Sequence, residues 1–148
     1  MLQDLLRRLA GPPARDPHTP EDARLAMAAL MVRISRTDGH YADAERHLID
    51  AMLAERYALS PRDAARVRAE AELAEADAQD TVRFTRLIKE AVPYEERAGV
   101  VESLWRVAAG DDGVNADEHG LMRLVASLLG VADQDSALAR QRALSDGR

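Results

Sequence analysis

The sequence of 148 residues contains no cysteine and few aromatic residues, with one Trp, one Phe and three Tyr. Without cysteine the chain cannot form disulfide bonds, zinc–thiolate sites or iron–sulfur clusters, and it has no thiol nucleophile. The lack of cysteine also suits a reducing compartment, so we expect a cytoplasmic protein. A chain of this length fits one domain that buries about two-thirds of the surface exposed in its unfolded form.

Long apolar runs and basic stripes are also missing. Uncharged stretches such as Leu25 to Val32 are far shorter than the roughly 20 apolar residues that span a bilayer, so we expect no transmembrane segment. The net charge is −6 and the basic residues are mixed with acidic ones, so we expect no nucleic-acid ligand. No nucleophile-elbow serine and no glycine-rich phosphate loop occurs. The common catalytic motifs are therefore absent.

The residues that do dominate are alanine, leucine, arginine and glutamate, which favour helix. We expect an all-α protein. The 3.6-residue spacing of apolar side chains and the turn signals between them predict eight helices, at about residues 1–10, 19–37, 43–57, 60–78, 81–91, 94–112, 116–129 and 133–144. Residues 1–18 are predicted to form the first short helix and a linker, and residues 19–148 the helical domain.

Local signals predict how several helices begin. Thr19, with Pro20 and Asp22 after it, resembles a capping box. We expect Asp43 to cap the third helix, and Ser60 to begin a more acidic fourth helix whose surface is mostly solvated.

Aromatic and histidine side chains give no functional signal. Phe84 and Trp105 lie inside apolar helical patterns, so we expect both in the core. His47 and His119 have no second histidine on the same face, so ordinary exposed histidines are expected rather than a transition-metal site.

The chain contains an internal repeat. Residues 35–49, SRTDGHYADAERHLI, are echoed by residues 108–122, AAGDDGVNADEHGLM. Alignment at the Asp-Gly pairs places Leu30 on Leu104 with an offset of 74, and beyond the turn Ser60 matches Asp133 with an offset of 73. The repeat predicts a duplicated three-helix unit, helices two to four and six to eight, with helix five as a bridge.

The two Asp-Gly turns admit two interpretations. In the first, glycine closes the preceding helix in a left-handed conformation and the turns are purely structural. However, Asp38 and Asp112 follow helix C-termini, where the helix dipole disfavours a carboxylate by roughly 0.3–1 kcal/mol. Capping of the next helix, a neighbour such as Arg36, or a cation shared with Glu45 and Glu118 would compensate. The second interpretation is therefore a metal site.

A standard EF-hand does not fit either turn. With Asp38 at loop position 5, Glu45 falls on position 12, but positions 1 and 3 become Ile34 and Arg36, which cannot bind Ca²⁺. In the second copy, position 12 becomes His119. Any metal site must therefore draw further ligands from elsewhere in the fold.

From Leu25 to Leu144 the sequence resembles the TerB-like domains associated with tellurite resistance. The resemblance is carried by the segments RTDGHYADAERHLIDAMLAERYALS, VRFTRLIKEAVPYEERAGVVESLWRVAAGDDG and NADEHGLMRLVASLLGVAD. It implies an all-helical domain of two related halves, without established enzymatic activity, in bacterial stress-response contexts and in some co-chaperone-like proteins. It also implies divalent metal at the two turns, with Asp38 and Glu45 matching in the first copy and Asp112 and Glu118 in the second.

These observations lead to one expectation and one alternative. We expect a non-enzymatic stress-response adaptor with a protein partner and a divalent metal ion at the acidic turns. The alternative is a metal-dependent hydrolase that uses the paired carboxylates, which would require an open metal position inside a pocket. The first predicted helix has leucines on one face beside Arg7 and Arg8. It suits docking to a partner, weak contact with a membrane surface, or packing onto the domain.

Overall fold

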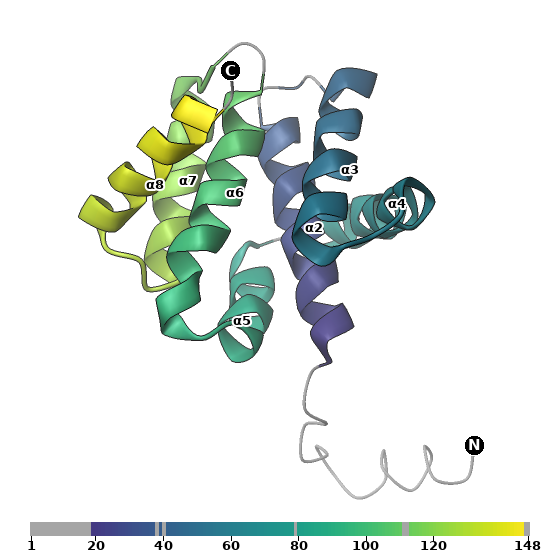
Figure 1. Cartoon of the computed structure of the whole chain (residues 1–148), viewed down its shortest axis with the longest axis horizontal. Helices are drawn as coiled ribbons and strands as arrows, with labels where there is room; N and C mark the ends of the chain where they lie inside the picture. The colour runs from purple at the N-terminus through teal and green to yellow at the C-terminus, as the bar shows by residue number, and fades with distance from the viewer. Residues whose placement is uncertain (1–18, 38, 40, 79, 111–112, 147–148) are drawn as a thin grey trace, which may run out of the picture.

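The computed structural model describes residues 19–37, 39, 41–78, 80–110 and 113–146. These residues form seven α-helices and no strand, which confirms the all-α prediction; the first predicted helix lies outside them. The helices are α2 (Pro20–Arg36), α3 (Asp43–Tyr57), α4 (Pro61–Asp77), α5 (Val82–Ala91), α6 (Arg97–Ala109), α7 (Ala116–Leu128) and α8 (Asp133–Asp146) (Figure 1). A short 3₁₀ turn, η1 (Tyr94–Glu96), separates α5 from α6, so α6 begins three residues later than the sequence predicts.

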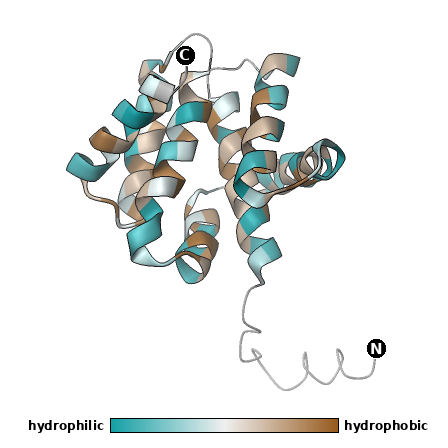
Figure 2. Ribbon diagram, viewed as in Figure 1, coloured by the Kyte–Doolittle hydropathy of each residue, from teal (hydrophilic) through white to brown (hydrophobic). Residues whose placement is uncertain are grey.

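Helix α2 lies at the centre of the fold. All of its side chains from Met27 to Val32 are at most 1% exposed, and the helix packs against α4, α5 and α6. A helix that is apolar on every side is stable only when other helices surround it. Along the outer helices, hydrophilic and hydrophobic residues are interspersed (Figure 2).

The helix starts follow the predicted signals with one exception. The Thr19 hydroxyl accepts a hydrogen bond from the Asp22 amide, and the Asp22 carboxylate accepts one from the Thr19 amide. The Ser60 hydroxyl likewise accepts one from the Asp63 amide. The prediction that Asp43 caps α3 is wrong, because Ala42 occupies the cap position. Asp43 is the first helical residue, and its carboxylate instead pairs with Arg46 at 3.0 Å.

The two predicted core aromatics are buried, with Phe84 5% and Trp105 3% exposed. The indole N–H of Trp105 donates a hydrogen bond to the Ser136 hydroxyl at 3.1 Å, and the Arg140 guanidinium stacks on its ring at 5.2 Å. The core prediction is confirmed, and the polar edge of the indole has the partner that burial requires.

The two halves of the domain are arranged alike in several respects. Leu30 and Leu104 are both fully buried, and the first helix of each half packs most extensively on the third, α2 on α4 and α6 on α8. Neighbouring helices α2 and α6 run in the same direction, so their carboxyl ends and the amino ends of α3 and α7 lie at one end of the molecule (Figure 1). Descent from one duplicated unit stays a prediction.

Candidate metal site at the two Asp-Gly turns

Of the four predicted ligands, Glu45 and Glu118 are described, whereas Asp38 and Asp112 lie outside the described residues. Each glutamate is the third residue of its helix, and its side chain caps the N-terminus of that helix. The amide of Ala42 donates to Glu45 Oε2 at 3.0 Å, and the amide of Asn115 donates to Glu118 Oε1 at 3.2 Å. Both glutamates thus satisfy a backbone donor that the helix itself cannot.

The two turns differ in how complete this capping is. The Asn115 side chain accepts a hydrogen bond from the Glu118 amide at 2.8 Å, which completes a reciprocal capping box. Ala42 has no side-chain acceptor, so the first turn has only half of this arrangement. Glu118 is 6% exposed, whereas Glu45 is half-buried. Sequence analysis missed Asn115, although Asn followed three residues later by Glu is a recognisable helix start.

The glycine of each turn adopts the predicted left-handed conformation. Gly39 has φ of 80° and Gly113 has φ of 82°. The Gly39 amide donates to the Arg36 carbonyl at 3.0 Å, and the Gly113 amide donates to the Ala109 carbonyl at 2.7 Å. A Cβ at either glycine would meet no atom within 4 Å. Conformation rather than space therefore requires glycine here.

An arginine–tyrosine stack lies beside the first turn. The Tyr41 ring faces two guanidiniums, that of Arg36 at 4.9 Å and that of Arg46 at 4.7 Å. Arg36 pairs with Glu75 at 2.7 Å, and Arg46 pairs with Glu72 at 3.4 Å. Both carboxylates come from α4. The stack therefore ties the connection between α2 and α3 to a third helix.

Further ion pairs extend this network across α4. Arg33 contacts Glu75 at 3.3 Å, and Arg68 contacts Asp50 at 2.6 Å and Glu72 at 3.3 Å. The side chains of Glu75 and Glu72 are only 14% and 21% exposed. The expectation of a mostly solvated α4 is therefore wrong for this face, because arginines from α2 and α3 cover its carboxylates.

The network changes the pKa of Tyr41 and that of Glu72. Burial raises the pKa of Tyr41 above its ordinary value, and the Glu72 carboxylate adds to the increase. Burial alone would raise the pKa of Glu72, but the Tyr41 hydroxyl and the guanidiniums of Arg68 and Arg46 outweigh it and lower that pKa. Tyr41 is therefore neutral and Glu72 ionised at neutral pH.

The second turn lies beside Trp105. The His119 ring is 5.7 Å from the Trp105 ring at an interplanar angle of 53°. His119 is half-buried, so the prediction of an exposed histidine is wrong for it, because α7 turns the residue toward the indole. His47 is exposed, as predicted.

The candidate ligands suit a hard cation such as Ca²⁺, Mg²⁺ or Mn²⁺, because all are carboxylates. Within the described residues, no group of three or more His, Asp or Glu side chains is placed to hold a metal ion. Glu45 and Glu118 contribute one carboxylate at each turn. A complete ligand set therefore depends on Asp38 and Asp112, which lie outside that part of the chain.

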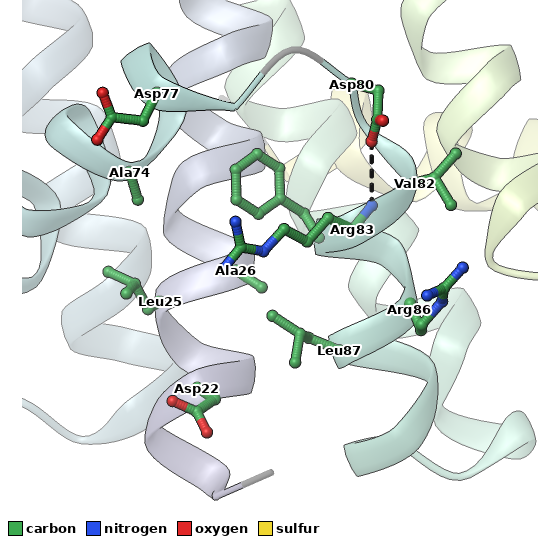
Figure 3. Close-up of a pocket in the computed structure, with 11 residues that line it drawn as sticks. Asp22, Leu25, Ala26, Ala74, Asp77, Asp80, Val82, Arg83, Arg86 and Leu87 are labelled. Atoms are coloured by element: carbon green, nitrogen blue, oxygen red, sulfur yellow. Dashed lines mark hydrogen bonds between the residues drawn. The ribbon is translucent and has the colours of Figure 1, made fainter. Parts of the chain in front are cut away.

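A pocket of about 780 Å³ lies elsewhere, between α2, α4 and α5 (Figure 3). Glu45 and Glu118, the two predicted ligands that the structure describes, are not among its lining residues. Among the described helices, none has the length and apolar character needed to cross a bilayer.

Comparison with known proteins identifies the family. Residues 24–141 match the family model described as Tellurite resistance protein TerB. No curated protein and no solved structure matches the chain. The match covers the helical domain from the second turn of α2 to the third turn of α8, including both Asp-Gly turns. The chain therefore belongs to the TerB family of tellurite resistance proteins.

Proposed function

We propose that this chain is a non-enzymatic, cytoplasmic adaptor of the stress response that binds a divalent cation through Asp38, Glu45, Asp112 and Glu118. Membership of the TerB family supports the stress-response context. The cation site is supported by one observation above all, which is that the parallel packing of α2 and α6 brings the helix ends at both turns to the same end of the molecule (Figure 1).

Electrostatics favour a cation at this end. The carboxyl ends of α2 and α6 carry the negative ends of two helix dipoles, and the adjacent turn sequences add carboxylates. A bound cation offsets both. Glu45 Oε2 and Glu118 Oε1 each accept an amide hydrogen bond, and a carboxylate has about four acceptor positions. Capping therefore does not prevent either side chain from binding a metal ion.

The cation also provides a link to the adaptor role. The α2–α3 connection is already tied to α4 by Arg36, Arg46 and Tyr41. A cation held by residues of both turns would join it to the α6–α7 connection as well. The end of the molecule would then become a single ordered surface, which a protein partner binds at a lower entropic cost than a loose one.

Glutamine substitutions separate metal binding from capping. Glu45→Gln and Glu118→Gln remove the charge, but glutamine caps a helix in the same way as glutamate. By calorimetric titration with Ca²⁺, Mg²⁺ or Mn²⁺, we expect saturable binding to the wild type and affinity lowered about 10-fold or more in each variant. In chelator, the melting temperatures of both variants should stay within about 2 °C of the wild type.

The matched control is Asp117→Asn, which removes an exposed carboxylate one residue before Glu118 and should leave metal affinity unchanged. Equal affinity in the wild type and both glutamine variants would contradict the proposed ligands. Hydrolysis of a model phosphoester or ester by the metal-loaded wild type, lost in the glutamine variants, would contradict the non-enzymatic role.

A further inference from the structure

The pocket between α2, α4 and α5 has an apolar floor. Ala26 and Phe84 are buried in it, at 1% and 5% exposure. Leu25 and Leu87 are half-buried, and Val82 is 41% exposed. On α4, Leu73 precedes the lining residue Ala74 and is 73% exposed. This floor leaves apolar surface in contact with water, and such a surface is typical of a binding groove.

The rim of the pocket is charged. It carries three aspartates and two arginines, so its net charge is −1; these residues are Asp22, Asp77, Asp80, Arg83 and Arg86. Arg83 extends across the pocket toward α2, while its backbone amide donates to the Asp80 carboxylate at 3.4 Å (Figure 3). A ligand that suits this pocket has an apolar face flanked by charges of both signs, with a positive excess.

The chain itself contains a segment of that composition. Residues 1–10, MLQDLLRRLA, carry leucines at positions 2, 5, 6 and 9, and Asp4, Arg7 and Arg8 provide one net positive charge. At helical spacing the leucines share one face, and the charged residues lie outside it. A helix of ten residues is marginal alone in water. It therefore needs a surface on which to bury its leucines.

We propose that residues 1–10 bind as an amphipathic helix in the pocket between α2, α4 and α5 of the same chain. The leucine face would cover Leu25, Val82 and Leu87, and the arginines would reach the aspartates of the rim. This inference does not depend on the metal site, because the lining residues of the pocket do not include Glu45 or Glu118, the two described members of that site.

The chain length permits this arrangement. Nine residue steps separate Ala10 from Thr19 and span at most about 30 Å. Asp22 and Leu25 lie in the first two turns of α2, and Leu25 is about 9 Å along the helix from Thr19. A short tether of this kind supplies an effective concentration in the millimolar range. Weak binding is therefore sufficient to keep the pocket occupied.

Occupation of the pocket by the chain's own segment makes the interaction a competitive one. A partner with a similar amphipathic helix must displace residues 1–10 before it can bind the floor of the pocket. The released leucines are then available to the same partner. The segment would thus raise the concentration of partner needed for binding, in inverse proportion to the fraction of chains whose pocket is empty.

The absence of cysteine makes the test direct. In the full chain, Asp4→Cys places a single thiol outside the leucine face, where a nitroxide spin label can be attached. We expect the label to broaden the NMR methyl signals of Leu25 and Leu87 and to leave those of Leu138, on α8, sharp. The broadening should not depend on protein concentration, because the contact is intramolecular.

Two variants of the labelled chain separate docking from the proximity that the tether alone imposes. Leu5→Glu with Leu6→Glu removes the apolar face and should abolish most of the broadening at Leu25 and Leu87. Gln3→Glu adds a negative charge outside that face and should leave the broadening at Leu25 and Leu87 unchanged. Equal broadening in both variants would overturn the proposal.

Two other results would also overturn it. Broadening that vanishes on dilution would show that the segment binds a second copy of the chain. Sharp pocket signals, together with binding to anionic phospholipid vesicles that the two Leu→Glu substitutions abolish, would show that the segment binds a membrane surface.

Discussion

At the scale of single residues, the environment of Tyr41 shows how the first turn is held. Its ring is covered by two guanidiniums, and each guanidinium is paired with a different glutamate of α4. No local pattern predicts this arrangement, since Arg36 and Glu75 are 39 residues apart. By contrast, the capping by Thr19 and Ser60 was predictable, because all its partners lie within three residues.

The raised pKa of Tyr41 makes a pH-dependent prediction. The folded state holds the phenol proton more tightly than the unfolded state, in which the pKa is about 10. The resulting stabilisation is present in full below about pH 10 and is lost as pH rises through the folded pKa. Tyr41→Phe keeps the ring between the arginines. In urea titrations at about pH 9 and pH 11, the unfolding free energy should therefore fall less in the variant; an equal fall would contradict this account.

Trp105 makes a second prediction at this scale. The side chain is 3% exposed and hydrogen-bonded to Ser136, so its native fluorescence should be blue-shifted and should move to the red on unfolding. Trp105→Ala should cost roughly 3–5 kcal/mol, because it leaves a large cavity in the core. A loss below about 1 kcal/mol in chemical denaturation, or native emission like that of free tryptophan in water, would show that this side chain is not part of the core.

At the scale of helices, α4 is the element that the sequence described least well. Its acidic residues suggested a solvated surface, yet Glu72 and Glu75 face arginines of α2, α3 and α4 itself. The pair of Arg68 and Glu72 has the spacing of four residues that stabilises helices and was detectable. The ion pairs between α4 and the arginines of α2 were not detectable, because they depend on the direction in which α4 crosses α2. The pocket was missed for the same reason.

Glu75 tests the importance of this contact between helices. Its side chain is 14% exposed, and its carboxylate pairs with Arg33 and Arg36. Glu75→Ala should cost about 3 kcal/mol, at the lower end for a buried ion pair, since Arg36 keeps partial access to water. The control is Arg66→Ala, which removes an exposed pair at 3.9 Å within α4 and should cost at most about 0.5 kcal/mol. Equal losses in the two variants, measured by denaturant titration, would mean that the network does not hold α4 in place.

At the scale of the whole molecule, the internal repeat predicted a relation between the two Asp-Gly turns that neither turn shows by itself. It indicated two related turns, and the structure places the helix ends that flank both of them at one end of the domain (Figure 1). The periodicity could not show that α2 and α6 run side by side in the same direction. It also could not show that the turns differ, with a complete capping box at Glu118 and half of one at Glu45.

Thermal unfolding with and without metal tests the proposed cation most directly. A cation that binds only the folded state adds about 2.7 kcal/mol of stability at 100 times its dissociation constant. For a domain of this size, each kcal/mol raises the melting temperature by roughly 2–4 °C. We therefore predict an increase of about 5–10 °C for the wild type on going from chelator to millimolar Ca²⁺, Mg²⁺ or Mn²⁺. Melting curves that are identical in chelator and in every one of these metals would contradict cation binding and leave both Asp-Gly turns with a purely structural role.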